Sequence, residues 1–122
     1  AAAEQKAANR LTEAERKAAV KRAAQMLAEK TAHFAKEMGV TYGRITIREQ
    51  KTRWGSCSSA GNLNYNWKLV LMPERVMDYV VIHELAHRKE MNHSARFYAV
   101  VAQQMPDYKV WQSWLKEHGR EY

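Results

Sequence analysis

The sequence predicts an α+β fold in which a small antiparallel sheet of about three strands packs on a buried helix, with further helices at both ends. Residues 1–38 are rich in Ala, Glu, Lys and Arg and contain neither Gly nor Pro, which favours helix. Residues 44–48 and 63–67 alternate polar and apolar side chains in the manner of half-buried strands. Helical patterns return from about residue 72. A chain of 122 residues with 46% hydrophobic residues suits one modest core.

The N-terminal helix has a defined start and stop in the sequence. Thr12 followed by Glu15 predicts a capping box, so the helix is expected to begin near residue 13. Gly39 is typical of a helix C-terminus. We therefore interpret residues 1–38 as an Ala-rich helix that belongs to the same domain as the core formed by residues 39–122.

Three short segments predict the sheet. Residues 44–48, 54–57 and 63–67 are strand candidates, and the turn-forming sequence Ser-Ser-Ala-Gly-Asn at 58–62 predicts a hairpin between the second and the third. Residues 69–71 are expected to extend the third strand towards the next helix.

Three helices are expected in the C-terminal half. The first begins with Pro73 at its first helical position and runs to about Glu90. It is apolar on most faces, which predicts burial. A second is capped by Ser94, and a third runs from Pro106 to Gly119.

The motif His83-Glu84-Leu85-Ala86-His87 lies on the buried helix and predicts a metal centre. Four residues are just over one helical turn, so His83 and His87 project from the same face and can reach one ion. His93 follows beyond a predicted break at Asn92 and can supply a third imidazole. Three nitrogen ligands plus water are typical of a catalytic zinc site, whereas structural sites have four protein ligands. Nickel and cobalt are alternatives, because imidazole suits several divalent ions.

This arrangement indicates hydrolysis by metal-activated water. Zinc lowers the pKa of its bound water to about 7. Glu84 is positioned to take the proton of that water as it attacks a carbonyl, and then to deliver it to the leaving amine. The donor that stabilises the oxyanion is one of three candidates, Arg53, Tyr65 and Tyr98.

Three blocks of sequence resemble the YgjP-like metallopeptidase domain, a zincin-like family related to the SprT and WLM domains. They are KTRWGSCSSAGNLNYNWKLVLMP at 51–73, DYVVIHELAHRKEMNHSARFY at 78–98 and, more loosely, MPDYKVWQSWL at 105–115. The resemblance runs from about Val40 and implies a zincin-like fold and peptide-bond cleavage. It further implies that His83, His87 and His93 bind zinc and that Glu84 is the general base.

The resemblance also implies that the strand from Arg53 to Cys57 borders the active-site cleft. Arg53, Trp54 and Gly55 are the expected substrate-binding residues, because Gly55 lets a peptide approach closely and pair as an added strand. The spacing H-x3-H-x5-H equals that of metzincins, but those have Gly where this chain has Glu90. The turn towards His93 must therefore be made in another way.

Composition limits the partners. A net charge of +7 favours anionic partners such as nucleotides or nucleic acid besides a polypeptide substrate. No apolar run is long enough for a bilayer and no signal peptide is visible, so we expect no membrane partner. The single cysteine, Cys57, favours the cytoplasm, a reducing compartment.

Two other interpretations stay open at the level of sequence. One is a metal-dependent nucleotide phosphohydrolase, with phosphates held by the basic residues at positions 44, 48, 51 and 53. The other is a nucleic-acid-associated module that uses its basic surface.

Overall fold

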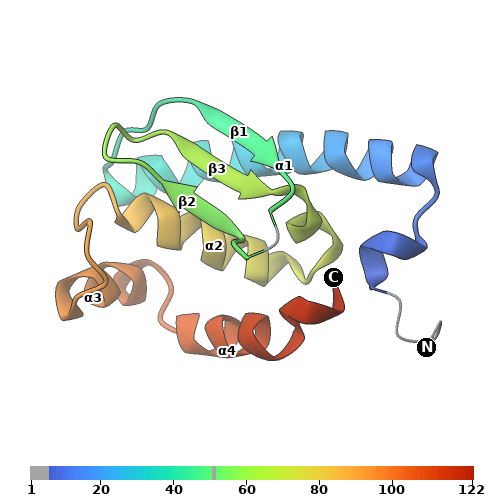
Figure 1. Ribbon diagram of the computed structural model, residues 1–122. Coiled ribbons are helices and arrows are strands. Elements are labelled where there is room, and N and C mark those ends of the chain that lie inside the picture. Colours follow the sequence, from blue (N-terminus) through green and yellow to red (C-terminus); the bar gives the residue numbers. More distant parts are fainter. Residues whose placement is uncertain (1–5, 51) are drawn as a thin grey trace.

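The structure is a computed structural model that describes residues 6–50 and 52–122 (Figure 1). It confirms the α+β class. The longer elements, in chain order, are helix α1 (Glu13–Met38), strands β1 (Ile45–Arg48), β2 (Gly55–Cys57) and β3 (Leu63–Asn66), and helices α2 (Glu74–Ala86), α3 (Ala95–Gln104) and α4 (Tyr108–His118). Short 3-10 helices are η2 (Ala7–Arg10), η3 (Trp67–Leu71) and η4 (Gly119–Glu121).

Helix α1 begins and ends as the sequence predicts. The backbone N–H of Glu15 donates to Thr12 Oγ1 (3.1 Å) and that of Thr12 donates to Glu15 Oε1 (2.9 Å), which completes the capping box. Gly39 ends the helix in the left-handed conformation, with φ of 69°. The buried stripe follows a four-residue spacing along one face: Ala19, Ala23, Leu27, Thr31 and Ala35. Mostly small side chains let α1 pack closely on α2 and η3.

The sheet is mixed, which corrects the prediction that it is antiparallel. The strand order is β1-β3-β2. β3 pairs antiparallel with β2, as the predicted hairpin requires, but it pairs parallel with β1. β3 is the most buried strand, and it inserts between the two strands that precede it. Alternation reports which face of a strand is buried and carries no information on the direction of its neighbour.

Four element boundaries also differ from expectation. Residues 67–71 form η3 and do not extend β3, because the Asn66 side chain accepts the Lys68 N–H (3.0 Å) and caps a helical turn. α2 ends at Ala86, not near Glu90, and Pro73 is its N-cap. α4 begins at Tyr108, two positions after Pro106.

The core lies between the sheet and α2. Helix α2 contacts α1, β2, α3 and α4, and Figure 1 shows it behind the sheet, alongside α1. Every residue from Val76 to Ile82 is buried, which confirms the expected buried helix. No helix in the described residues is both long enough and apolar enough to cross a bilayer.

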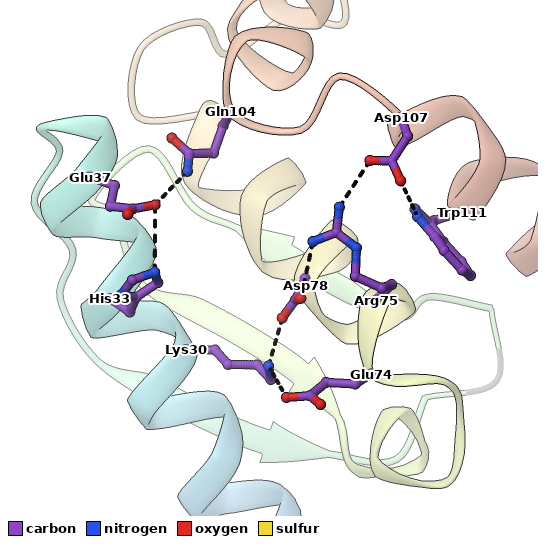
Figure 2. Close-up of polar contacts among 9 residues, drawn as sticks. All are labelled: Lys30, His33, Glu37, Glu74, Arg75, Asp78, Gln104, Asp107 and Trp111. Carbon is purple, nitrogen blue, oxygen red and sulfur yellow. Dashed lines mark hydrogen bonds and ion pairs between the residues drawn. The ribbon is translucent and has the colours of Figure 1, made fainter.

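A chain of ion pairs ties α1, α2 and the start of α4 together (Figure 2). Lys30 Nζ lies 2.7 Å from carboxylate oxygens of both Asp78 and Glu74. Arg75 contacts Asp78 (3.5 Å) and Asp107 (2.9 Å). Asp107 in turn accepts the indole N–H of Trp111 (3.1 Å). Asp78 is buried at the centre of this network and therefore fixes the rotation of α2 against α1.

Candidate metal centre

Three imidazoles converge at the C-terminal end of α2. His83 is on the helix, His87 is its C-cap, and His93 lies in the segment before α3. The Nε2 atom of His93 lies 3.2 Å from Nε2 of His83 and 3.1 Å from Nε2 of His87. Zinc–nitrogen bonds of about 2.0–2.1 Å at tetrahedral angles separate two ligand nitrogens by about 3.3–3.4 Å. Two of the three distances are therefore close to those around a single tetrahedral ion, and the ligand atoms of all three histidines lie within 4.8 Å of one another.

The turn that returns His93 to the helix needs no glycine. The amides of Lys89 and Glu90 both donate to the carbonyl of Ala86 (3.0 Å each), so the chain makes one tight helical turn after α2. The Glu90 carbonyl also lies 3.3 Å from His87 Nδ1. No non-glycine residue in the described chain has a positive φ. Glu90 therefore replaces the metzincin glycine without backbone strain.

Phe97 forms the floor under the three rings. Its ring centroid lies 4.9 Å from His83, 4.5 Å from His87 and 4.9 Å from His93. The side chain is fully buried. Ser94 caps α3 by accepting the Phe97 N–H (3.3 Å), which places Phe97 in the first turn of that helix. Sequence reasoning found the cap but missed the role of Phe97, for which only its position just after His93 gives a signal.

Burial favours the neutral form of His83 and His87. Desolvation, together with the neighbouring His87 and His93, lowers the pKa of His83 to about 4. Burial and His93 also lower the pKa of His87. A neutral imidazole is the form that binds a metal, so at neutral pH no proton has to leave these two rings before an ion binds.

The Tyr79 side chain, which the sequence did not single out, contacts the Nδ1 atom of His83. Its hydroxyl oxygen lies 3.3 Å from His83 Nδ1. If His83 binds an ion through Nε2, Nδ1 carries the proton and donates to Tyr79. The two residues are one helical turn apart on α2, so the i, i+4 spacing was the available signal.

Glu84 is itself buried and lines a small pocket together with His83. Burial raises the pKa of its carboxyl to about 7, and the charge of Arg53 acts in the opposite direction. The pocket has a volume of about 180 Å³ and is lined by Arg53, Trp54, Gly55, Tyr79, Val80, His83, Glu84 and Leu115. The structure thus brings all three predicted substrate-binding residues together with Glu84 and His83. Leu115, from α4, was not foreseen.

The remaining sequence candidates lie elsewhere. The Tyr65 hydroxyl points towards α1, 2.9 Å from Thr31 Oγ1, and the residue is 1% exposed, so it is no longer a candidate oxyanion donor. Tyr98 stacks on His93 with centroids 6.3 Å apart. Cys57 is a free thiol that is not part of the histidine cluster, and burial raises its pKa. Lys51, one of the basic residues considered for phosphate binding, lies outside the described residues.

Arg88 anchors the centre to the hairpin. It follows His87 directly, and its guanidinium donates to the carbonyls of Thr41 (2.8 Å) and Ser59 (3.2 Å). Gly61 has φ of 88°, and a Cβ there would lie 2.7 Å from the Arg88 guanidinium carbon. The hairpin turn is therefore shaped around the side chain adjacent to a histidine of the cluster.

Gly55 is expected to tolerate no side chain without loss of activity. A Cβ at this position would lie 3.1 Å from Glu84 Cγ and 3.2 Å from Glu84 Oε2. We predict that Gly55→Ala lowers kcat/KM about tenfold or more by displacing the carboxylate, while the unfolding midpoint changes little. Ser56→Ala, the next position on the same strand, is the matched control. Equal effects of the two changes on kcat/KM would contradict this role of Gly55.

Comparison with known proteins supplies the family. The family model described as the YgjP-like metallopeptidase domain matches residues 1–118, so the match includes α1, beyond the resemblance seen from Val40 onwards. No curated protein matches.

Two solved structures share the fold. The metallopeptidase zymogen of Pyrococcus abyssi abylysin is 23% identical, with a TM-score of 0.66, over 75% of this chain and 93% of the other. The metallopeptidase zymogen of Methanocaldococcus jannaschii jannalysin is 19% identical, with a TM-score of 0.57, over 69% and 90%. These likenesses confirm the zincin-like architecture. With the family match across nearly its whole length, the chain belongs to the YgjP-like metallopeptidase domain family.

Proposed function

We propose that this metallopeptidase holds one zinc ion on His83, His87 and His93 and cleaves extended polypeptides with Glu84 as general base. The family match makes the chain a metallopeptidase and does not favour the nucleotide phosphohydrolase alternative. The observation that carries the residue assignment is the convergence of three Nε2 atoms, with contacts of 3.1 and 3.2 Å, beside a buried carboxylate. The donor chemistry, three imidazoles, suits zinc, with nickel and cobalt as alternatives.

The substrate is proposed to lie along β2. This strand is at the edge of the sheet, where an extended peptide can add by main-chain hydrogen bonds. Gly55 packs directly against Glu84, so the carboxylate lies next to the strand at which the peptide would add. Trp54 and Leu115 provide apolar surface at one end of the pocket.

Each residue then has a defined task in hydrolysis. A zinc ion held by His83, His87 and His93 would supply Lewis acidity, which makes water nucleophilic at neutral pH and polarises a carbonyl. A Glu84 carboxylate oxygen accepts the proton of the attacking water and later donates it to the leaving nitrogen. The C–N bond breaks, and the products are a carboxylate and an amine. Arg53 is the proposed oxyanion donor, because it lines the same pocket as Glu84.

The cytoplasm is proposed as the compartment. Cys57 is the only cysteine of the chain, and its thiol is free. A reducing environment is compatible with a free thiol of this kind.

Metal content tests the ligand assignment directly. We expect about one zinc per chain by elemental analysis of the purified protein, and a higher Tm after zinc addition, because an ion bound only to the folded state stabilises it. His93→Ala is expected to lose most of the zinc and most of the Tm increase. His33→Ala, a histidine whose side chain is 60% exposed on α1, is the control and should keep both. Full zinc retention in His93→Ala would contradict the assignment.

A further inference from the structure

A second, larger cavity adjoins the pocket of the metal centre. It has a volume of about 560 Å³, within the range of roughly 300–1,000 Å³ typical of ligand sites. Trp54 and Leu115 line both cavities, so these two side chains form a shared wall. The larger cavity lies where η2, the start of η3, residues 49, 50, 52 and 54, and the C-terminal end of α4 with η4 meet.

The lining of this cavity, which we call the basic cavity, carries an excess of positive charge. Its cationic side chains are Lys6, Lys68, Lys116 and Arg120. Among the described residues, Glu49 is the single acidic side chain in the lining. The acids nearest in sequence to Arg120 contact His118, with Glu121 2.5 Å and Glu117 3.8 Å from its ring nitrogens.

Glu49 is already engaged and offsets little of this charge. It accepts the indole N–H of Trp67 (2.9 Å), forms an ion pair with Arg16, and lies 3.5 Å from Lys68. The Trp67 hydrogen bond, followed by the charges of Lys68 and Arg16, keeps the pKa of the Glu49 carboxyl low, against the effect of burial. Lys6, Lys116 and Arg120 are exposed within the hollow, and their charge is available to an anionic ligand.

We infer that the basic cavity is a substrate subsite that takes acidic residues of a polypeptide whose scissile bond lies at the metal centre. This inference rests on the proposed function. A peptide paired with β2 would pass Trp54 at the start of the strand, and Trp54 lines the basic cavity. Carboxylates placed there meet several cations at once, which strengthens and orients binding.

The shape of the charged surface favours a polypeptide over nucleic acid. Nucleic-acid binding commonly uses a basic stripe or face that follows a phosphate backbone. Here the cations surround a hollow whose other walls include Trp54, Leu115 and Gly119. Gly119 is buried against Trp54, since a Cβ there would lie 3.1 Å from the indole Cζ2. The cavity is thus closed on that side and suits a few side chains better than a continuous strand.

The test measures binding and does not depend on turnover. Fluorescence anisotropy on the zinc-loaded Glu84→Gln variant would give Kd for two labelled twelve-residue peptides, one with four Glu residues at its N-terminal end and one with four at its C-terminal end. The same measurement is made on counterparts with Gln in place of Glu. We expect the Glu peptides to bind more tightly. In the Lys116→Gln/Arg120→Gln variant, the Kd of the Gln peptide divided by that of the Glu peptide should fall about fivefold, as expected for the loss of two exposed charge pairs.

A matched variant controls for net charge. Lys21→Gln/Lys109→Gln removes two exposed cations that do not line the cavity, and it should keep the preference for acidic peptides. Equal loss of preference in both double variants would overturn the inference, because diffuse charge would then explain it. A single-stranded oligonucleotide that binds more tightly than the Glu peptides, and loses this affinity in Lys116→Gln/Arg120→Gln, would also overturn it in favour of nucleic acid.

Turnover separates this inference from the proposed function. If the unaltered chain cleaves Glu and Gln peptides with equal kcat/KM and binds both equally, the inference fails and the peptidase assignment stands. If Glu peptides bind preferentially through Lys116 and Arg120 but no peptide is cleaved, the cavity is a binding site for acidic peptides and the proposed hydrolysis fails.

Discussion

Glu84→Gln is expected to lower kcat/KM for a casein-derived peptide by about 10³-fold, within the range of general acid–base catalysis. The amide keeps the shape of the side chain, so the packing of this buried residue against Gly55 is preserved. It has no carboxylate to accept the proton of water at neutral pH. The measurement is steady-state hydrolysis at fixed zinc concentration, combined with the zinc content of each protein.

Zinc content decides how this result is interpreted. Glu84→Gln should bind as much zinc as the unaltered chain, because the proposed ligands are the three histidines. Glu29→Gln, an exposed carboxylate on α1, is the control and should keep full activity and zinc. A Glu84→Gln protein that has lost its metal would show that Glu84 is a ligand and would contradict its role as a base.

Asp78→Ala is expected to reduce the free energy of unfolding by about 3 kcal/mol, the lower end of the range for breaking a buried ion pair. The side chains of Lys30 and Asp78 are 16% and 11% exposed, and their charged atoms lie 2.7 Å apart. Without Asp78, Lys30 keeps only Glu74, whose side chain is 67% exposed, as a partner within this network. Urea denaturation of the zinc-loaded protein measures the change.

Two further variants define the origin of this loss. Glu37→Ala removes an exposed carboxylate that accepts the Gln104 amide (2.7 Å) and pairs with His33 (3.5 Å) in the same region (Figure 2). It should cost less than about 1 kcal/mol. Lys30→Met combined with Asp78→Leu should recover much of the stability lost in Asp78→Ala, since it removes both charges together. A double variant no more stable than Asp78→Ala would show that the loss arises from packing.

Local sequence patterns were sufficient to predict the features that depend on residues close together in the chain. Thr12 and Glu15 are three residues apart, and their hydrogen bonds form within one helical turn. His83 and His87 share a helix face for the same reason. The start of α1, the buried character of α2 and the convergence of the two helical histidines all follow from spacing alone.

Features that depend on distant parts of the chain could not be predicted in this way. Several sheet topologies are compatible with the same alternation of polar and apolar residues, and the parallel pairing of β1 with β3 is one of them. Leu115 reaches the pocket only because α4 folds back on α2. The pairing of Lys30 with Asp78 joins residues far apart in sequence, and neither has a local pattern that predicts the other.

The contacts of Arg88 limit how the hairpin can be engineered. Surface turns between strands usually accept insertions, because little else depends on their backbone. Here the Ser59 carbonyl accepts a hydrogen bond from Arg88, the residue next to His87. Lengthening the 58–62 turn would break this bond and leave the segment that carries His87 less firmly held. A fused tag or epitope therefore belongs at a site remote from this turn, such as the exposed face of α1.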